Sequence, residues 1–578
     1  MRRLLSAALL LATVVYLTLL RTVPVPLLPE VRVSVKSPYT GEPLLGAYEQ
    51  VFQAKVRGDL KALQNYVETA TEDFLLYRTL LQLARSSLPA GERMRYLERV
   101  LAFELVSPLA RDDARRAQLE LARITEDAGR KSRALDAYAE ALPLDEAARG
   151  LVRLETDPRT LATIFLEARE YERTLAALGS HPAPAIRARC YAALGEHKNA
   201  LNAYNRWLER SPGSRAAREG KVWTLIALGR YAAARRVLST ADTPPQPSAE
   251  AALAVAQDDP EAALEAYMQM GQDGLWKATE LLERRGDTAA ALPYYLELAR
   301  TETAYQDDAA YRAYTLARRL GDEAATSEAA ALVPAFSFFG LLLGSSVPFI
   351  SERLPRVTPP ALARSRALVR AGDDEAALGE LLIALKRAPD EATTVALAEA
   401  LQDLGEYGAS SEAADLWLGR GSRSRRTWLS AYPRAYSEIV QEQAARWDVE
   451  PSFIWAVMRQ ESHFYPRAFS TSDAQGLMQL IPSTWDWLAE LLEETPGDPF
   501  DASENVRYGT FYLSKILATF SKEESSAAYN GGPGYIGRLL DEPYIGDEAD
   551  FYRFIGRAET REYLQQVMLN EAVYKALY

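Results

Sequence analysis

The chain has 578 residues, enough for three or four domains or for one long array and a separate domain. Its 66 basic and 79 acidic residues give a net charge of −13, which argues against nucleic acid as a partner because phosphate binding needs a basic surface. The single cysteine, Cys190, excludes an internal disulfide, and three scattered histidines without metal-ligand spacing argue against a zinc site. We expect no metal and no cofactor.

Residues 1–21 have the pattern of a targeting segment. Two arginines precede seventeen uncharged, mostly apolar positions, Leu4 to Leu20, as in a secretory signal. The run also reaches the minimum length of a membrane span, and no A-x-A-like cleavage site follows it. We predict a signal peptide or an uncleaved membrane anchor, and both place the rest of the chain outside the cytoplasm. Residues 22–45 contain five prolines and are predicted to form an extended linker.

Residues 46–426 are predicted to be helical almost throughout, because apolar positions recur at helical spacing. A longer period is also present: Leu194-Gly195 and Leu228-Gly229 are 34 positions apart, and further glycine pairs are 33 and 35 apart. This period resembles degenerate tetratricopeptide repeats, in which glycine ends one helix and hairpins stack into a superhelix. An unspecific helical array is the alternative. The apolar, Phe-rich stretch 332–350 is predicted to be a buried helical hairpin rather than a membrane span.

The periodicity stops near Arg426, and residues 427–578 are predicted to form one compact domain. A helix is expected to open at Pro451. Ile454, Val457, Met458 and Glu461 share one face of this helix, so a carboxylate ends an apolar stripe. Desolvation raises the pKa of such a carboxyl group, as a general acid requires. The alternative is a helix-end glutamate that is capped or paired at the surface.

Two glycine-containing segments follow in the same domain. Gly476 permits close backbone approach, and Gln479 offers both a donor and an acceptor, which suits the acetamido group of a sugar. In the second segment, three glycines and a proline follow Tyr529 and Asn530 directly, and the turn that they predict would present both side chains into a groove. Alone, either segment is more often an ordinary loop.

Together these segments resemble the soluble lytic murein transglycosylase family. The resemblance rests on Gln460-Glu461-Ser462, Ser470, Gly476-Leu477-Met478-Gln479, Asn505 with Gly509, Tyr529 to Gly534, the closing motif Glu559 to Tyr563 and the lead-in Tyr432-Pro433. It implies an all-α chain: a superhelical region and then a lysozyme-like, mainly helical catalytic domain. Glu461 would be the catalytic acid/base. Ser470, Met478, Gln479, Tyr529 and Asn530 would line the glycan groove, with Glu559 as a supporting carboxylate. Two departures are Asp473, where the family usually has glycine, and Gly531, where alanine is usual.

The resemblance implies a lytic transglycosylase that cleaves the β-1,4 bond between N-acetylmuramic acid and N-acetylglucosamine and leaves 1,6-anhydro ends. One alternative is a muramidase-type hydrolase, which needs a positioned water and usually a second carboxylate, with Asp473 and Glu559 as candidates. Another is a non-catalytic scaffold that binds glycan and protein. The expected partners are peptidoglycan strands, proteins bound by the helical repeats, and the membrane if residues 1–21 remain uncleaved. The expected location is the cell envelope, outside the cytoplasm.

Overall fold

The computed structural model describes residues 37–70, 73–103, 108–142, 144–239, 247–347, 354–470 and 473–578. The predicted signal or anchor, 1–21, and most of the predicted linker lie outside these ranges. In the part of the chain that is described, no helix is both long and apolar enough to cross a membrane. The same part contains helices and, apart from two isolated bridges that both involve Gln475, no β-structure, which confirms the predicted all-α class.

The array consists of short helices that pack mainly on their neighbours in sequence. They are η1 (Pro43–Leu45), α2 (Gly46–Arg57), α3 (Leu60–Thr69), α4 (Phe74–Ala84), α5 (Ala90–Leu101), α6 (Pro108–Asp127), α7 (Lys131–Glu140), α8 (Asp145–Leu154), α9 (Pro158–Glu167), α10 (Tyr171–Leu178), α11 (Pro184–Ala193), α12 (His197–Arg210), α13 (Arg215–Ala227), α14 (Tyr231–Ser239), α15 (Pro247–Ala256), α16 (Pro260–Met268), α17 (Gly271–Arg284), α18 (Thr288–Ala299), α19 (Gln306–Leu320), α20 (Glu323–Leu332), α21 (Phe338–Leu342), α22 (Pro360–Arg370), α23 (Asp374–Lys386), α24 (Glu391–Asp403) and α25 (Tyr407–Leu418).

The repeat signals occupy the structural positions that the period predicts. The periodic glycines lie in the turns between helices, and Gly195, for example, has φ +71, a left-handed conformation that glycine adopts without steric cost. Alanines that follow the glycines, such as Ala200 and Ala291, have no exposed surface, so adjacent helices approach closely. Several helices also begin with an aspartate whose side chain accepts a backbone N–H, as Asp373 does for α23. Local sequence therefore sets both the turns and the helix starts.

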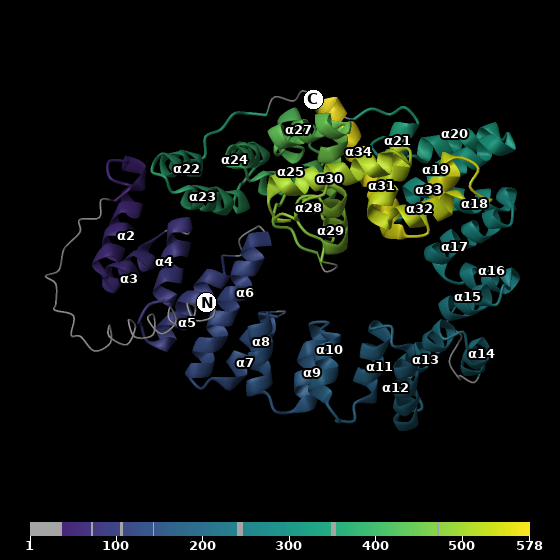
Figure 1. Cartoon of the computed structure of the whole chain (residues 1–578), viewed down its shortest axis with the longest axis horizontal. Helices are drawn as coiled ribbons and strands as arrows, with labels where there is room; N and C mark the ends of the chain where they lie inside the picture. Colours follow the sequence, from purple (N-terminus) through teal and green to yellow (C-terminus); the bar gives the residue numbers. More distant parts are fainter. Residues whose placement is uncertain are drawn as a thin grey trace, which may run out of the picture.

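The array curves until its two ends meet, so that α2–α4 lie near α22–α23 (Figure 1). Tyr48 O–H donates to Glu380 Oε1 at 2.7 Å, and Gly379 lets α23 approach the ring of Phe74. The predicted linker, 22–45, extends too far along the chain, because its last residues belong to the contact between the two ends of the array. Tyr39 and Leu45 are buried there, and the local proline content gave no sign of their distant partners.

The predicted hairpin at 332–350 is also wrong. Residues 338–342 form one short helix, α21, and the residues on either side of it are not helical up to residue 347. Phe338 and Phe339 are buried, and the ring of Phe338 meets Tyr552 edge-on with centroids 5.1 Å apart. The apolar residues of this stretch therefore pack on each other, on Tyr311 of α19 and on the C-terminal part of the chain.

The C-terminal part contains α26 (Arg425–Ala431), α27 (Ser437–Trp447), α28 (Pro451–Ser462), α29 (Pro482–Leu491), α30 (Ala502–Leu517), α31 (Lys522–Gly531), α32 (Pro533–Leu540), α33 (Glu548–Phe554) and α34 (Ala558–Leu577). Helix α28 packs on α34, and α31 packs on α34 as well. The predicted boundary at 426/427 falls inside α26, which packs on α24 and α25. We therefore propose that the domain begins after α26.

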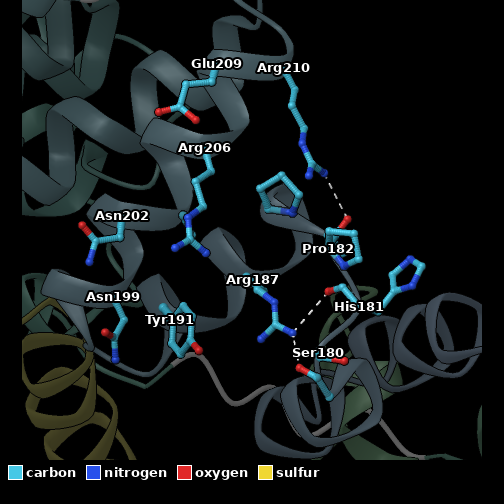
Figure 2. A pocket seen from close by; sticks show the side chains of 14 residues that line it. Ser180, His181, Pro182, Arg187, Tyr191, Asn199, Asn202, Arg206, Glu209 and Arg210 are labelled. Atoms are coloured by element: carbon cyan, nitrogen blue, oxygen red, sulfur yellow. Dashed lines mark hydrogen bonds between the residues drawn. The ribbon is translucent and has the colours of Figure 1, made fainter.

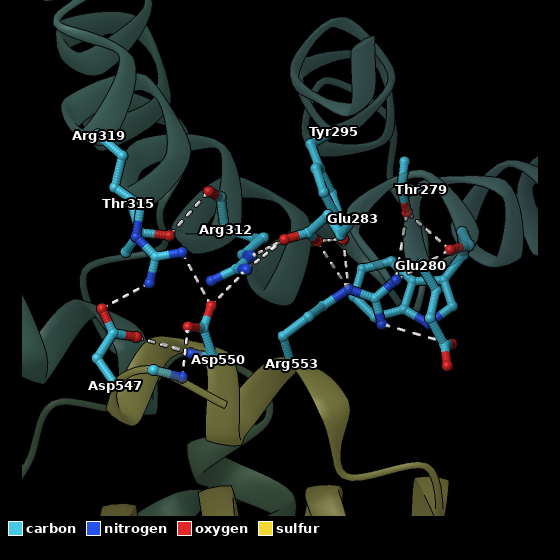
Figure 3. A network of polar contacts seen from close by, with 12 residues as sticks. Thr279, Glu280, Glu283, Tyr295, Arg312, Thr315, Arg319, Asp547, Asp550 and Arg553 are labelled. Carbon is cyan, nitrogen blue, oxygen red and sulfur yellow. Dashed lines mark hydrogen bonds and ion pairs between the residues drawn. The ribbon is translucent and has the colours of Figure 1, made fainter. Parts of the chain in front are cut away.

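The C-terminal domain docks on α17–α21 through an apolar core and a buried network of charges (Figure 3). Arg312 of α19 contacts Glu283 of α17, with Nε and Oε2 2.8 Å apart, and Asp550 of α33, with Nη2 and Oδ1 2.7 Å apart. The Arg553 guanidinium of α33 lies 4.0 Å from the ring centre of Trp276. Because separating the two parts would leave these charges without their partners, the network favours this docking position.

Candidate active site

The glutamate at the end of α28 lies where the apolar stripe predicts. Ile454, Val457 and Met458 on the same face have no exposed surface, and Glu461 follows them in the last turn, half-buried. The helix ends immediately afterwards at His463, which is left-handed at φ +47. The carboxylate therefore sits at the edge of the hydrophobic core, where one side of it is desolvated.

Burial raises the pKa of Glu461 from 4.5 to about 8. The Tyr563 O–H donates to Glu461 Oε1 at 2.7 Å, which stabilises the ionised form and opposes this rise in pKa. The negative charge of Glu559 adds to the rise. A carboxyl group in this setting holds its proton near neutral pH, as the resemblance requires of a catalytic acid.

Three tyrosine rings form a wall beside the carboxylate. The rings of Tyr529 and Tyr563 are stacked, with centroids 6.4 Å apart, and Tyr512 lies 5.3 Å from Tyr529. The Tyr529 O–H donates to the Met478 carbonyl at 2.8 Å. Tyr529 therefore joins α31 to the Gly476 loop, and its hydroxyl is engaged within the protein.

The Gly476 loop is held by side chains from two helices. Asn505 of α30 accepts from the Met478 N–H at 2.7 Å and donates to the Gln475 carbonyl at 3.0 Å. Ser462, next to the glutamate, donates to the Leu477 carbonyl at 2.7 Å. These bonds fix the loop relative to α28, so the residues after Gly476 have a defined position beside Glu461.

Two predicted glycan-binding residues lie in this loop. The Met478 side chain is fully buried and contacts Gly509, so in this structure it supports the loop from within the core and presents no surface to a ligand. Gln479 is half-buried, and its Nε2 donates to the Ala468 carbonyl at 3.1 Å and to the Gly476 carbonyl at 2.8 Å. Its Oε1 is the atom left to accept from a sugar amide.

Ser470 and Asp473 lie at the rim, next to residues outside the described ranges. The Ser470 hydroxyl accepts from the Ala474 N–H at 3.0 Å. Asp473 is exposed and has φ +62, a left-handed conformation that explains why glycine suits this position. An aspartate here therefore costs backbone strain.

The remaining predicted residues meet at the start of α34. Asn530 is half-buried, and its Oδ1 accepts from the Thr560 hydroxyl at 2.7 Å, which leaves the amide N–H₂ free to donate. Glu559 is exposed in the first turn. A Cβ at Gly531 would lie 2.9 Å from Thr560 Cγ2, so the departure to glycine makes room for Thr560.

The sequence pattern did not single out Tyr563 or Thr560. Both belong to the closing motif, and their spacing of three residues places them on one face of α34. That spacing was a usable signal, but it indicates a function only once α34 is known to pack on α28 and α31.

The geometry defines a class of protein: a lysozyme-like domain with one desolvated glutamate, carried on a tetratricopeptide-like helical array. Family models agree with both parts. Residues 438–551 match the transglycosylase SLT domain, and residues 54–268 match the tetratricopeptide repeat.

Curated relatives match the C-terminal part of the sequence. The soluble lytic murein transglycosylase of Escherichia coli (strain K12) is 31% identical over 151 residues, which cover 25% of this chain and 23% of that protein. The putative soluble lytic murein transglycosylase of Haemophilus influenzae (strain ATCC 51907 / DSM 11121 / KW20 / Rd) is 34% identical over 152 residues, 25% of this chain and 26% of that protein. These alignments thus span about a quarter of the relatives' length.

Solved structures extend the similarity in fold to nearly the whole chain. The 70-kDa soluble lytic transglycosylase in its complex with bulgecin A matches with a TM-score of 0.61 and 20% identity, over 92% of this chain and 96% of that one. An inactive mutant of the lytic transglycosylase Slt from Pseudomonas aeruginosa matches with a TM-score of 0.55 and 20% identity, over the same shares. The resemblance to soluble lytic murein transglycosylases is confirmed in sequence for the C-terminal domain, and the fold is shared over 92% of the chain.

Proposed function

We propose that this protein is a peptidoglycan lytic transglycosylase, a carbon–oxygen lyase that cleaves the bond between N-acetylmuramic acid and N-acetylglucosamine. The observation that carries the proposal is the environment of Glu461. Its carboxyl group is partly desolvated at the end of an apolar helix face, with a pKa of about 8, and receives a hydrogen bond from Tyr563. Such a group is protonated before the reaction and stabilised once it is ionised.

Both states are needed in the proposed mechanism. Protonated Glu461 donates to the bridging glycosidic oxygen, the bond from that oxygen to C1 of the muramic acid breaks, and the N-acetylglucosamine end leaves as an alcohol. The Tyr563 O–H stabilises the carboxylate that forms. The carboxylate then accepts the proton of the muramyl 6-hydroxyl while that oxygen bonds to C1. The product is a 1,6-anhydro end, Glu461 is protonated again, and no water is consumed.

The hydrolase alternative requires another carboxylate to activate a water. Asp473 and Glu559 are both exposed and therefore lack the desolvation that distinguishes Glu461. For Glu559 we propose an electrostatic role, because its charge raises the pKa of Glu461. The binding-scaffold alternative gives no reason for a carboxyl group to be held desolvated at this position.

Product analysis separates the three candidates. Purified sacculi are digested in ¹⁸O-labelled water, and the released muropeptides are examined by mass spectrometry. A transglycosylase releases unlabelled products whose anhydro ends are lighter by one water than reducing ends. A hydrolase releases labelled reducing ends, and a scaffold releases nothing, so either result overturns the proposal.

We propose that Gln479 Oε1 and the Asn530 amide contact the acetamido and hydroxyl groups of the glycan, because these polar atoms beside Glu461 are left to pair. For Ser470 we propose a glycan contact from the family resemblance and from its position at the rim of the site. We also propose an extracytoplasmic location in the cell envelope, with residues 1–21 as signal or anchor. The second proposal is supported by the sequence of that segment and by the substrate, which lies outside the cytoplasm.

A specific feature of the array favours a protein partner as well. A groove of about 620 Å³ opens between α11, α12 and the turn that precedes α11 (Figure 2). Arg187, Arg206 and Arg210 line it together with Glu209, so its lining is basic in a chain of net charge −13. Arg210 donates to the Pro182 carbonyl at 3.2 Å, which fixes one guanidinium at the rim. We propose that the groove binds the C-terminal carboxylate of a partner peptide, which guanidinium groups recognise by paired hydrogen bonds.

Fluorescence anisotropy tests this binding with a labelled peptide that carries a free carboxylate and the same peptide amidated. Arg206→Gln should weaken binding of the free carboxylate only, whereas Arg189→Gln, on the same array but outside the groove lining, should not. Equal binding of the amidated peptide would contradict the proposal.

A further inference from the structure

Helix α34 lies between the array and the glutamate of the active site. One face of its first turns carries Thr560, bound to Asn530, and Tyr563, bound to Glu461, each at 2.7 Å. Arg561, one position after Thr560, points to a different side of the helix, with Gln565 one turn further on. The position of α34 therefore decides where the Tyr563 hydroxyl lies.

The array holds this second side of α34 with one carboxylate. Asp308 of α19 accepts from Gln565 Nε2 at 3.0 Å, and its Oδ1 lies 3.4 Å from Arg561 Nε. The Asp308 and Arg561 side chains are only 11% and 10% exposed, so the pair is largely shielded from water. The Arg561 guanidinium also lies 5.4 Å from the ring centre of Trp276 in α17.

The preceding helix is held by the same two array helices. Figure 3 shows Arg312 of α19 paired with Asp550 of α33. It also shows Arg553 of α33 beside Glu283 and Thr279 of α17, and Arg553 donates to the Thr279 hydroxyl. Only a short turn, Ile555–Arg557, separates α33 from α34. The array therefore fixes α33 and the first turns of α34 together.

We infer that Asp308 is a positioning residue for the reaction: through Arg561 and Gln565 it fixes the start of α34 and thereby holds the Tyr563 hydroxyl on Glu461. The inference rests on the proposed function and extends it to a residue outside the C-terminal domain. Without the Asp308 charge, Arg561 is a buried cation that has lost its ion-pair partner, and such a group moves toward water. The turn of α34 that carries Tyr563 moves with it.

This displacement has an electrostatic signature. The titratable groups that face Glu461 are Tyr563, Tyr529 and Glu559, from α34 and α31. Tyr563 lowers the pKa of Glu461, so losing its hydrogen bond moves the alkaline limb of the pH–rate profile upward. Burial raises the pKa of Asp308, and the charges of Arg561 and Arg553 and the hydrogen bond from Gln565 oppose this rise, whereas Asp307 adds to it.

Asp308→Asn in the full chain tests the inference, with Asp307→Asn as the matched control. Asp307 precedes it on the same helix and is half-buried. We expect Asp308→Asn to lower kcat about tenfold or more, because small misplacements of catalytic groups are costly, with little change in KM. The alkaline limb should move upward. Asp308→Glu, which keeps the charge, should recover part of the loss, and Asp307→Asn should lower kcat much less than Asp308→Asn.

The double variant Asp308→Asn/Tyr563→Phe is decisive. If Asp308 acts through Tyr563, the Asp308 substitution moves the alkaline limb no further once the hydroxyl is gone. An equal shift in both backgrounds, or no difference between Asp308→Asn and Asp307→Asn, overturns the inference. If Asp308→Asn does not fold, Gln565→Met, which leaves the ion pair intact, should give the same effects at smaller size, and wild-type behaviour of that variant would equally overturn it.

Hydrogen exchange separates this inference from the proposed function. Peptides covering 558–566 should exchange faster in Asp308→Asn than in Asp307→Asn, with α28 unchanged. Unchanged exchange at 558–566 contradicts the inference whatever the activity. Absence of anhydro products from the wild-type protein instead contradicts the proposed function.

Discussion

Replacing Glu461 with glutamine tests the site in two independent ways. The substitution preserves size and can still donate a hydrogen bond, but it can neither deliver nor accept the proton. Because general acid–base catalysis is worth about 10²–10⁴-fold and one residue acts in both steps, we expect at least this loss in the release of muropeptides from sacculi. Binding to sacculi should persist.

The same variant should be more stable than wild type, and the gain should depend on pH. Between pH 4.5 and about 8 the folded protein keeps a proton on Glu461 that the unfolded chain releases, so wild-type stability falls as the pH rises through this window. This difference in pKa corresponds to at most about 5 kcal/mol in the free energy of unfolding. Because the side chain is only half-buried and solvent screens its charge, we expect the variant to gain about 1–3 kcal/mol in that free energy.

Melting temperatures of both proteins, measured from pH 5 to pH 9, give the test. The variant should melt close to wild type at pH 5 and roughly 3–10 °C higher at pH 8, with no further gain above that pH. Other titrating groups are common to both proteins and cancel in the difference. A gain that is the same at pH 5 and pH 8 would refute the reasoning about burial, and retention of more than about a tenth of wild-type turnover would refute the catalytic role.

Three further substitutions probe the surroundings of this residue. Tyr563→Phe removes the hydrogen bond that lowers the pKa of Glu461, so the alkaline limb of kcat/KM should move up and turnover should fall about tenfold; an unchanged limb would contradict the contact. Glu559→Gln removes a charge that raises the pKa of Glu461, so the alkaline limb should move to lower pH; a shift to higher pH would contradict this effect of Glu559. Gly476 has φ +77, and a Cβ there would lie within 2.3 Å of neighbouring atoms, so Gly476→Ala should lower the free energy of unfolding by about 3 kcal/mol. The control is Gly213→Ala, whose Cβ would meet nothing within 4 Å, and thermal melts should show that it is tolerated.

The sequence by itself determined the local structure of this protein. Glycines with left-handed backbone, aspartate N-caps and buried alanines at a regular period specify helical hairpins through contacts a few residues apart, and these can be predicted without the fold. The apolar stripe that ends at Glu461 likewise predicted the desolvated carboxyl group, because helical spacing alone places it beside Met458. Of the residues that the family motifs indicated, Tyr529 and Glu559 lie close enough to interact with its charge.

The tertiary structure decided which distant residues act together. Asp308 and Tyr563 are separated by more than 250 positions, and only the docking of α34 between the array and α28 makes one relevant to the other. The same holds for Tyr39, which looked like linker until the array brought Asp373 beside it. The physical reason is that backbone periodicity is set by near neighbours, whereas burial, ion pairing and pKa depend on whatever the folded chain brings within a few ångströms.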